Sequence, residues 1–141
     1  MKTTPIKRKL FFFQVPIYDR EICVIVGLNH EQALKAAKKQ KCTKQFIEAL
    51  NWETAKEVCD KVQDPNSQTE GAACRVNDNS YFLFLRPYKE DWQYLDILNH
   101  ECFHLTQYIA KVLTIWDEGE PPAYLHTWLF KALRRTLSGI K

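Results

Sequence analysis

The chain lacks several features that would assign it to a specialised class of protein. None of its apolar runs approaches the roughly 18–20 residues that a membrane-spanning helix needs, so no membrane partner is expected. The five cysteines are odd in number and form no Cys-x-x-Cys pair, which argues against a disulfide framework and against a thiolate zinc site. No internal repeat or low-complexity tract is present.

The chain also has little net charge. The net charge is only +3, and although five lysines gather between residues 35 and 44, a solvated helix face explains such a cluster. No nucleic-acid-binding signature accompanies it, so nucleic acid is not an expected partner. The basic residues 7–9 before Leu10 loosely imitate a signal peptide, but the apolar run stops at Gln14 and no small-residue cleavage site follows. A cytoplasmic location is therefore expected.

The composition supports one folded domain spanning residues 1–141. Apolar residues make up 45% of the chain, which is enough for a hydrophobic core in a domain of this length. Alternating and β-branched runs predict two β-hairpins, and helical periodicity and capping residues predict five helices. The expected strands are Leu10–Tyr18, Glu21–Leu28, Ala72–Val76 and Tyr81–Arg86, and the expected helices are His30–Gln40, Thr43–Leu50, Trp52–Val62 (capped by Asn51), Glu90–Leu113 and Pro121–Leu137. Strands segregated from a C-terminal pair of helices indicate an α+β fold.

The most informative motif is His-Glu-x-x-His, formed by His100, Glu101 and His104. Two histidines four residues apart lie on one face of a helix, so both imidazoles can bind one Zn²⁺ ion. Glu101 lies about 100° further round the helix, where its carboxylate can take a proton from the attacking water. This pattern is typical of zinc peptidases with a glutamate general base.

The surrounding residues favour a functional motif. An apolar stripe faces away from the two histidines and is formed by Leu95, Leu98, Cys102, Leu105, Ile109 and Val112. Ile97 and Tyr108 share the histidine side, so that side is not simply a solvated face. A helix with a core stripe on one side and a mixed polar face on the other suits the wall of a cleft.

A catalytic zinc ion needs a third protein ligand. The candidates are Glu120, Asp117, Glu118, His126 and Asp96. Glu120 has an alternative explanation, because Asp117 and Glu120 are spaced as a helix capping box. A tight antiparallel return of the last helix would also place residues 127–131, rather than Glu120, opposite the histidines.

The motif followed by Glu120-x-x-Ala123-Tyr124-Leu125 resembles the small zinc peptidases of tailed bacteriophages and, more distantly, the gluzincins. The resemblance covers roughly the last sixty residues. It implies a zincin-like domain that binds one Zn²⁺ per chain through His100, His104 and Glu120, with Glu101 as the base. A donor to the developing oxyanion is also expected, and Tyr108, Tyr124 and His126 are candidates.

Two functions remain open at this level. The first is a minimal zinc metallopeptidase, a hydrolase acting on a peptide or protein, in which the strand Tyr81–Leu85, or its neighbour if that strand is internal, pairs with the substrate backbone. The second is a metal-stabilised structural or interaction protein, such as a virion component of a phage. A phage source would place the protein in the cytoplasm of a bacterial host or in the particle.

Overall fold

The computed structural model describes residues 4–16, 18–113 and 120–139. The described chain is an α+β domain with a four-stranded mixed sheet and five helices, as the sequence predicts at this level. The elements in chain order are β1 (Lys9–Val15), β2 (Arg20–Val26), α1 (His30–Lys39), α2 (Lys44–Leu50), α3 (Glu53–Gln63), β3 (Gly71–Arg75), β4 (Ser80–Leu85), α4 (Trp92–Val112) and α5 (Glu120–Ser138). Each expected element is found, with ends shifted by a few residues.

The sheet has the strand order β1-β2-β4-β3. Both predicted hairpins are present, because β1 pairs antiparallel with β2 and β3 pairs antiparallel with β4. The two hairpins join through a parallel pairing of β2 with β4, which aligns Val24 with Leu83. β2 and β4 are therefore internal strands, and β1 and β3 form the two edges of the sheet.

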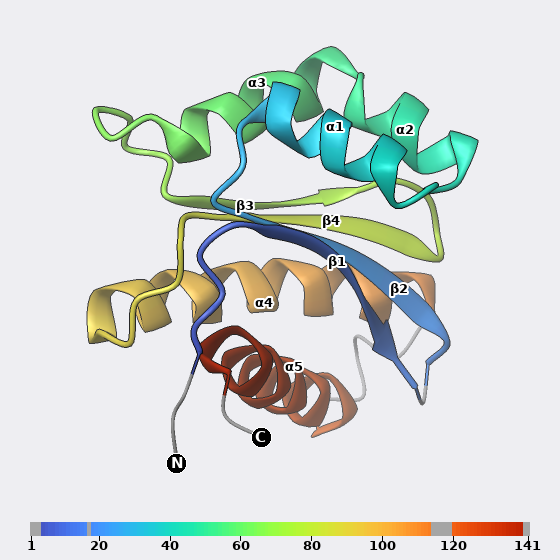
Figure 1. The fold of residues 1–141 in the computed structure, drawn as a ribbon. Helices are drawn as coiled ribbons and strands as arrows, with labels where there is room; N and C mark the ends of the chain where they lie inside the picture. Colours follow the sequence, from blue (N-terminus) through green and yellow to red (C-terminus); the bar gives the residue numbers. More distant parts are fainter. Residues whose placement is uncertain (1–3, 17, 114–119, 140–141) are drawn as a thin grey trace.

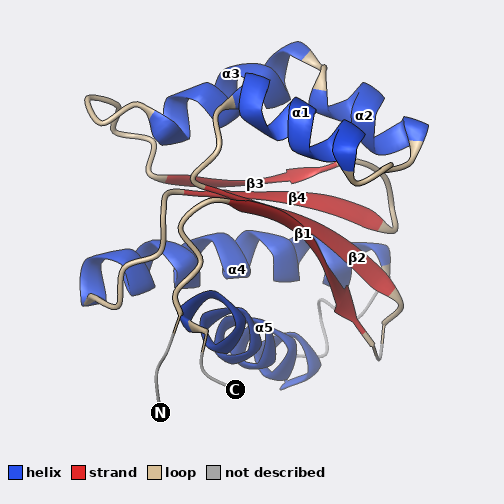
Figure 2. Ribbon diagram, viewed as in Figure 1, coloured by secondary structure: helices blue, strands red, loops and turns tan. Residues whose placement is uncertain are grey.

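Helices cover both faces of the sheet (Figure 1). Helices α1, α2 and α3 lie on one face, and α4 and α5 lie on the other, as Figure 2 shows in blue around the red strands. Two hydrophobic cores result, one on each face of the sheet. Residues 22–26 of β2 are all buried, which is expected for a central strand covered on both faces.

Local signals in the sequence account for most helix boundaries. Asn29 caps α1 in a capping box with Gln32, and Thr43 caps α2 by accepting a hydrogen bond from the Phe46 N–H. The prediction that Asn51 caps α3 is wrong. Asn51 instead ends α2, and its side chain donates to the Ile47 carbonyl, while α3 begins after Trp52 without a side-chain cap.

The cysteines behave as core residues. All five are free thiols, and Cys23, Cys59 and Cys102 are buried. Burial raises the pKa of Cys59 and of Cys102 to about 12, so both remain protonated at neutral pH. Within the described ranges, no helix combines the length and apolar character that a membrane span requires.

Candidate metal centre

The motif lies in the middle of α4, a helix capped by Asp91, whose side chain accepts a hydrogen bond from the Tyr94 N–H. The predicted apolar stripe is buried along its middle, where Leu98, Cys102, Leu105 and Ile109 pack against the sheet and α5. Leu95 and Val112, at its two ends, are partly buried. The opposite line of the helix carries His100, which is exposed, and His104, which is half-buried. The helix therefore presents both imidazoles on its outer side.

The two imidazoles converge on one point. His100 Nε2 and His104 Nε2 are 3.1 Å apart, and the rings stand at 83° to each other. Two nitrogens bound to the same tetrahedral zinc ion at 2.0–2.1 Å are separated by about 3.3–3.4 Å. The pair therefore fits a shared metal ion with almost no rearrangement, although the same distance also suits an N–H···N hydrogen bond.

Gln107 selects the tautomer of His104. Its Oε1 lies 3.2 Å from His104 Nδ1, and an amide oxygen can only accept a hydrogen bond. His104 Nδ1 must then carry the proton, which leaves the lone pair on Nε2, the nitrogen that faces His100. Metal-binding histidines are commonly oriented in this way by a partner on the other nitrogen. The sequence analysis did not identify Gln107, although its position one turn after His104 was the available signal.

Glu101 lies on the side of α4 that faces β3. Only 7% of the residue is exposed, and its carboxylate accepts a hydrogen bond from the Ala73 backbone N–H. Burial raises the pKa of the carboxyl group, while the two neighbouring histidines and the Ala73 N–H oppose this rise. Glu101 is thus a partly desolvated carboxyl group beside the imidazole pair.

The edge strand β3 runs close to α4. A Cβ atom at Gly71 would lie 2.9 Å from Ile97 Cγ2 and 3.3 Å from Glu101 Cγ, so the missing side chain permits the close approach. Because β4 is internal, its segment Tyr81–Leu85 cannot pair with a further strand. The neighbouring strand β3, named as the alternative, is the edge beside the motif helix.

The two tyrosine candidates lie in different places. The Tyr108 hydroxyl donates a hydrogen bond of 3.4 Å to the Ala73 carbonyl, and its ring stacks on Tyr81. Tyr108 is therefore at the β3 edge near Glu101. Tyr124 is 70% exposed and lines a separate cavity with Val15.

Among the described side chains, none of the candidates for a third ligand is brought together with the two histidines. No group of three His, Cys, Asp or Glu residues placed to hold a metal is found in the described ranges. Glu120 begins α5, but its side chain lies outside the description, as do Asp117 and Glu118 entirely. His126 Nε2 is instead 3.1 Å from the Asn99 carbonyl, and Asp96 is exposed on α4. The contact of His126 shows that α5 passes beside the motif six residues after Glu120.

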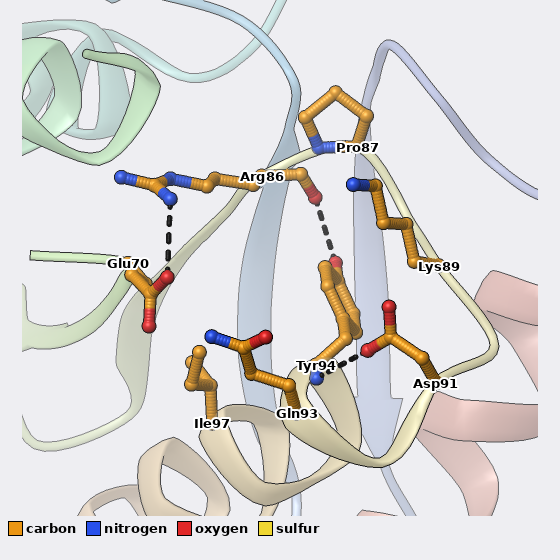
Figure 3. Close-up of a pocket in the computed structure, with 8 residues that line it drawn as sticks. All are labelled: Glu70, Arg86, Pro87, Lys89, Asp91, Gln93, Tyr94 and Ile97. Carbon is orange, nitrogen blue, oxygen red and sulfur yellow. Dashed lines mark hydrogen bonds and ion pairs between the residues drawn. The ribbon is translucent and has the colours of Figure 1, made fainter. Parts of the chain in front are cut away.

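A cavity of about 240 Å³ opens one turn before the motif (Figure 3). Ile97 of α4 lies in its wall together with Tyr94, whose hydroxyl donates to the Arg86 carbonyl. The remaining lining residues are Glu70, Arg86, Pro87, Lys89, Asp91 and Gln93. Since Ile97 also contacts the β3 edge at Gly71, the cavity and the motif lie along the same side of α4.

Arg86 organises the wall of this cavity. Its guanidinium donates to the carbonyls of Val62, Asp64 and Ser67 and to the carboxylate of Glu70, which ties the loop before β3 to the end of β4.

We expect Arg86→Ala to lower the free energy of unfolding by about 2–3 kcal/mol, because several partly buried acceptors lose a charged donor. Urea denaturation measures the loss. A change within 0.5 kcal/mol, the usual range for a surface position, would show that the loop does not depend on Arg86.

Comparison of the chain with known proteins gives no further information about this centre. No family model, no curated protein and no solved structure matches it. The functional conclusion therefore rests on the convergent imidazoles, the tautomer set by Gln107 and the partly desolvated Glu101 beside the β3 edge.

Proposed function

We propose that the protein is a minimal zinc metallopeptidase with its metal site on α4. The observation that carries this proposal is the 3.1 Å separation of His100 Nε2 and His104 Nε2 beside the buried Glu101 carboxyl group. A bound zinc ion supplies Lewis acidity, polarising the scissile carbonyl and lowering the pKa of a water molecule to about 7. One ion per chain would be held by the two imidazoles.

Glu101 is the general base in this proposal. Its carboxylate takes a proton from the attacking water and passes it to the nitrogen of the leaving amine. Burial suits this role, because a raised pKa brings a carboxyl group closer to the pH at which it must both accept and donate a proton. The Ala73 N–H holds the carboxyl group against β3 and so fixes its orientation.

The arrangement around the motif also supports a peptidase. The edge strand β3 lies beside the motif helix α4, and a second helix, α5, follows α4 in the chain. This arrangement is compatible with the zincin-like fold that the sequence resemblance implies. Residues 71, 73 and 75 of β3 direct their N–H and C=O groups away from β4. Glu101 and Tyr108 occupy those of Ala73, so the backbone of an extended substrate would pair with those of Gly71 and Arg75. The cavity at Ile97 would then receive one substrate side chain.

Glu120 is the proposed third ligand, at the start of the helix that follows the motif helix. His126 lies near the motif at Asn99, and Glu120 lies six residues earlier, or about 9 Å along the helix axis. An oxygen ligand from this helix would complete a site of three protein ligands and one open position. Tyr108 is the proposed oxyanion donor, since it is the candidate tyrosine close to Glu101.

The alternative proposal is a metal-stabilised interaction protein without peptidase activity, such as a phage particle component. A structural zinc site is closed by four protein ligands, and Asp117 or His126 would be the candidates for the fourth. The hydrogen bond between His126 Nε2 and the Asn99 carbonyl disfavours that role. The contact of His126 therefore favours the open catalytic type of site over one closed by His126, while Asp117 lies outside the described residues.

Zinc content tests the centre directly. We expect wild-type protein to bind about one zinc per chain and His104→Ala to lose it, because one imidazole cannot hold the ion at purification concentrations. Elemental analysis of protein purified without added metal measures both. His126→Ala is the matched control and should keep its zinc, since this histidine bonds to a backbone carbonyl.

A substitution of Gln107 tests whether its contact with His104 strengthens zinc binding. Gln107→Ala should retain both ligands but weaken zinc binding by about 10–100-fold, because the proton on His104 Nδ1 is no longer held in place. Wild-type protein that is folded and still empty after dialysis against zinc would refute the metal site. Zinc lost from His126→Ala would favour the closed structural site instead.

A further inference from the structure

The second edge of the sheet, formed by β1, is open. Gln40 Nε2 donates to the Leu10 carbonyl, so this carbonyl points away from β2. Residues two apart on a strand point the same way, and therefore Phe12 and Gln14 also direct their backbone groups outward. Among the described residues, these outward N–H and C=O groups of Phe12 and Gln14 have no hydrogen-bond partner. Figure 1 shows β1 at the near edge of the sheet, with α1 above it and α5 below it.

An apolar cavity of about 460 Å³ lies at the C-terminal end of this edge. It is formed between the end of β1 and one side of α5, with Trp128 packed against Phe13 at a ring separation of 5.7 Å. The lining residues are Val15, Pro16, Tyr18, Tyr124, Leu125, Thr127, Trp128 and Lys131. Trp128 is 41% exposed and Tyr124 is 70% exposed, so aromatic surface faces solvent at this point.

Positive charge surrounds the edge and the cavity. Arg8 and Lys9 lie at the start of β1, while the Lys7 ammonium donates to the Tyr88 carbonyl. Lys38 and Lys39 end α1 and Lys41 follows it, at the point where Gln40 ties the helix to Leu10. Lys131 lines the cavity. A broader hollow on α5 is lined by Trp128 and Lys131 as well, together with Arg134 and Arg135. Arg134 is paired with Glu90, and the nearby acids are Asp19 and Glu21 at the β1–β2 turn. The cations outnumber the acids around this surface.

We propose that the β1 edge binds an extended acidic peptide segment of a partner protein, which adds a strand to the sheet and places one apolar side chain in the Trp128 cavity. The open backbone groups supply strand pairing, the cavity supplies an anchor, and the lysines supply charge complementarity. A second copy of this chain would bring a like-charged edge, which opposes pairing. Nucleic acid would make no use of the backbone edge or of the apolar cavity.

This surface is distinct from the proposed metal centre. The centre lies at β3, the opposite edge of the sheet, where Glu101 and Tyr108 occupy the outward groups of Ala73. The inference therefore stands or fails independently of peptidase activity.

The test uses a short fluorescein-labelled peptide with alternating Val and Thr residues around one Leu and with Asp-Glu pairs at both ends. Fluorescence anisotropy should show binding by the whole protein that weakens as salt is raised. Lys131→Glu and Trp128→Ala should each weaken binding by about tenfold or more, as expected for central contacts. Lys56→Glu and Trp52→Ala are the matched controls on α3 and its N-terminus, and should bind like wild type.

Two altered probes examine the mode of binding. A peptide N-methylated at every residue of its Val/Thr segment offers no backbone N–H to the edge strand, and a peptide with Lys in place of its acids has the wrong charge, so neither should bind. Equal binding of either would overturn the proposal, as would no binding of the acidic peptide. Lys131→Glu lies at an exposed position and should remain folded even if Trp128→Ala loosens the contact with Phe13. Binding of oligo(dT) alone, or self-association lost in Lys131→Glu, would assign the surface to nucleic acid or to a second copy and reject the peptide.

Discussion

Glu101→Gln is expected to abolish peptide hydrolysis while zinc content and folding stay unchanged. The amide cannot accept a proton from water, and loss of general base catalysis lowers rates by about 10²–10⁴-fold. Gln has the same shape as Glu, and its Oε1 can still accept the hydrogen bond from the Ala73 N–H. The variant should therefore retain the contact between α4 and β3. A fluorogenic peptide library, elemental analysis and a thermal melt measure the three properties.

Glu48→Gln is the matched control, because Glu48 is an exposed residue of α2 that forms only a surface ion pair with Lys44. It should cleave at the wild-type rate. Normal cleavage by Glu101→Gln would show that another group removes the proton. Zinc lost from Glu101→Gln would mean that this carboxylate binds the ion, and Glu101 would then be a ligand.

The features that the sequence predicted correctly depend on neighbours along the chain. The capping box of Asn29 and Gln32 and the apolar stripe through Leu98 and Leu105 each need only a few consecutive residues to be recognised. The spacing of His100 and His104 is of the same kind, since one helical turn brings the imidazoles together whatever the rest of the fold does.

The features that the sequence did not predict depend on contacts between distant segments. The parallel pairing of β2 with β4 makes β4 internal, and no local pattern specifies that pairing. The burial of Glu101 follows from the close approach of β3 to α4 at Gly71, which precedes His100 by 29 residues (100 − 71) in the sequence. Asn51 is a suitable cap by residue type, but its side chain bonds to the preceding helix, because the Ile47 carbonyl is one turn away.

Gly27→Ala is expected to cause the largest loss of stability of any conservative substitution considered for this chain. Gly27 follows β2 and has a φ of +65°, a conformation that costs an L-residue about 1–2 kcal/mol. An added Cβ would also lie 1.9 Å from the backbone oxygen of Lys7, and a backbone atom cannot rotate away as a side chain can. We expect the free energy of unfolding to fall by about 3 kcal/mol or more, with a melting temperature lower by roughly 10 °C.

Gly71→Ala is the informative partner of that substitution, because its methyl group would approach only side-chain atoms too closely, while the nearest backbone atom, Phe84 O, lies at 3.5 Å, an ordinary van der Waals distance. Ile97 Cγ2 and Glu101 Cγ are its nearest neighbours, and the backbone there has no positive φ. Stability should fall by about 1 kcal/mol or less. Hydrolysis should fall by about 10–100-fold, since displacement of a catalytic group by a fraction of an ångström is costly. Equal melting temperatures of Gly27→Ala and Gly71→Ala would contradict the predicted backbone strain at Gly27. Full activity in Gly71→Ala would show that β3 does not position Glu101.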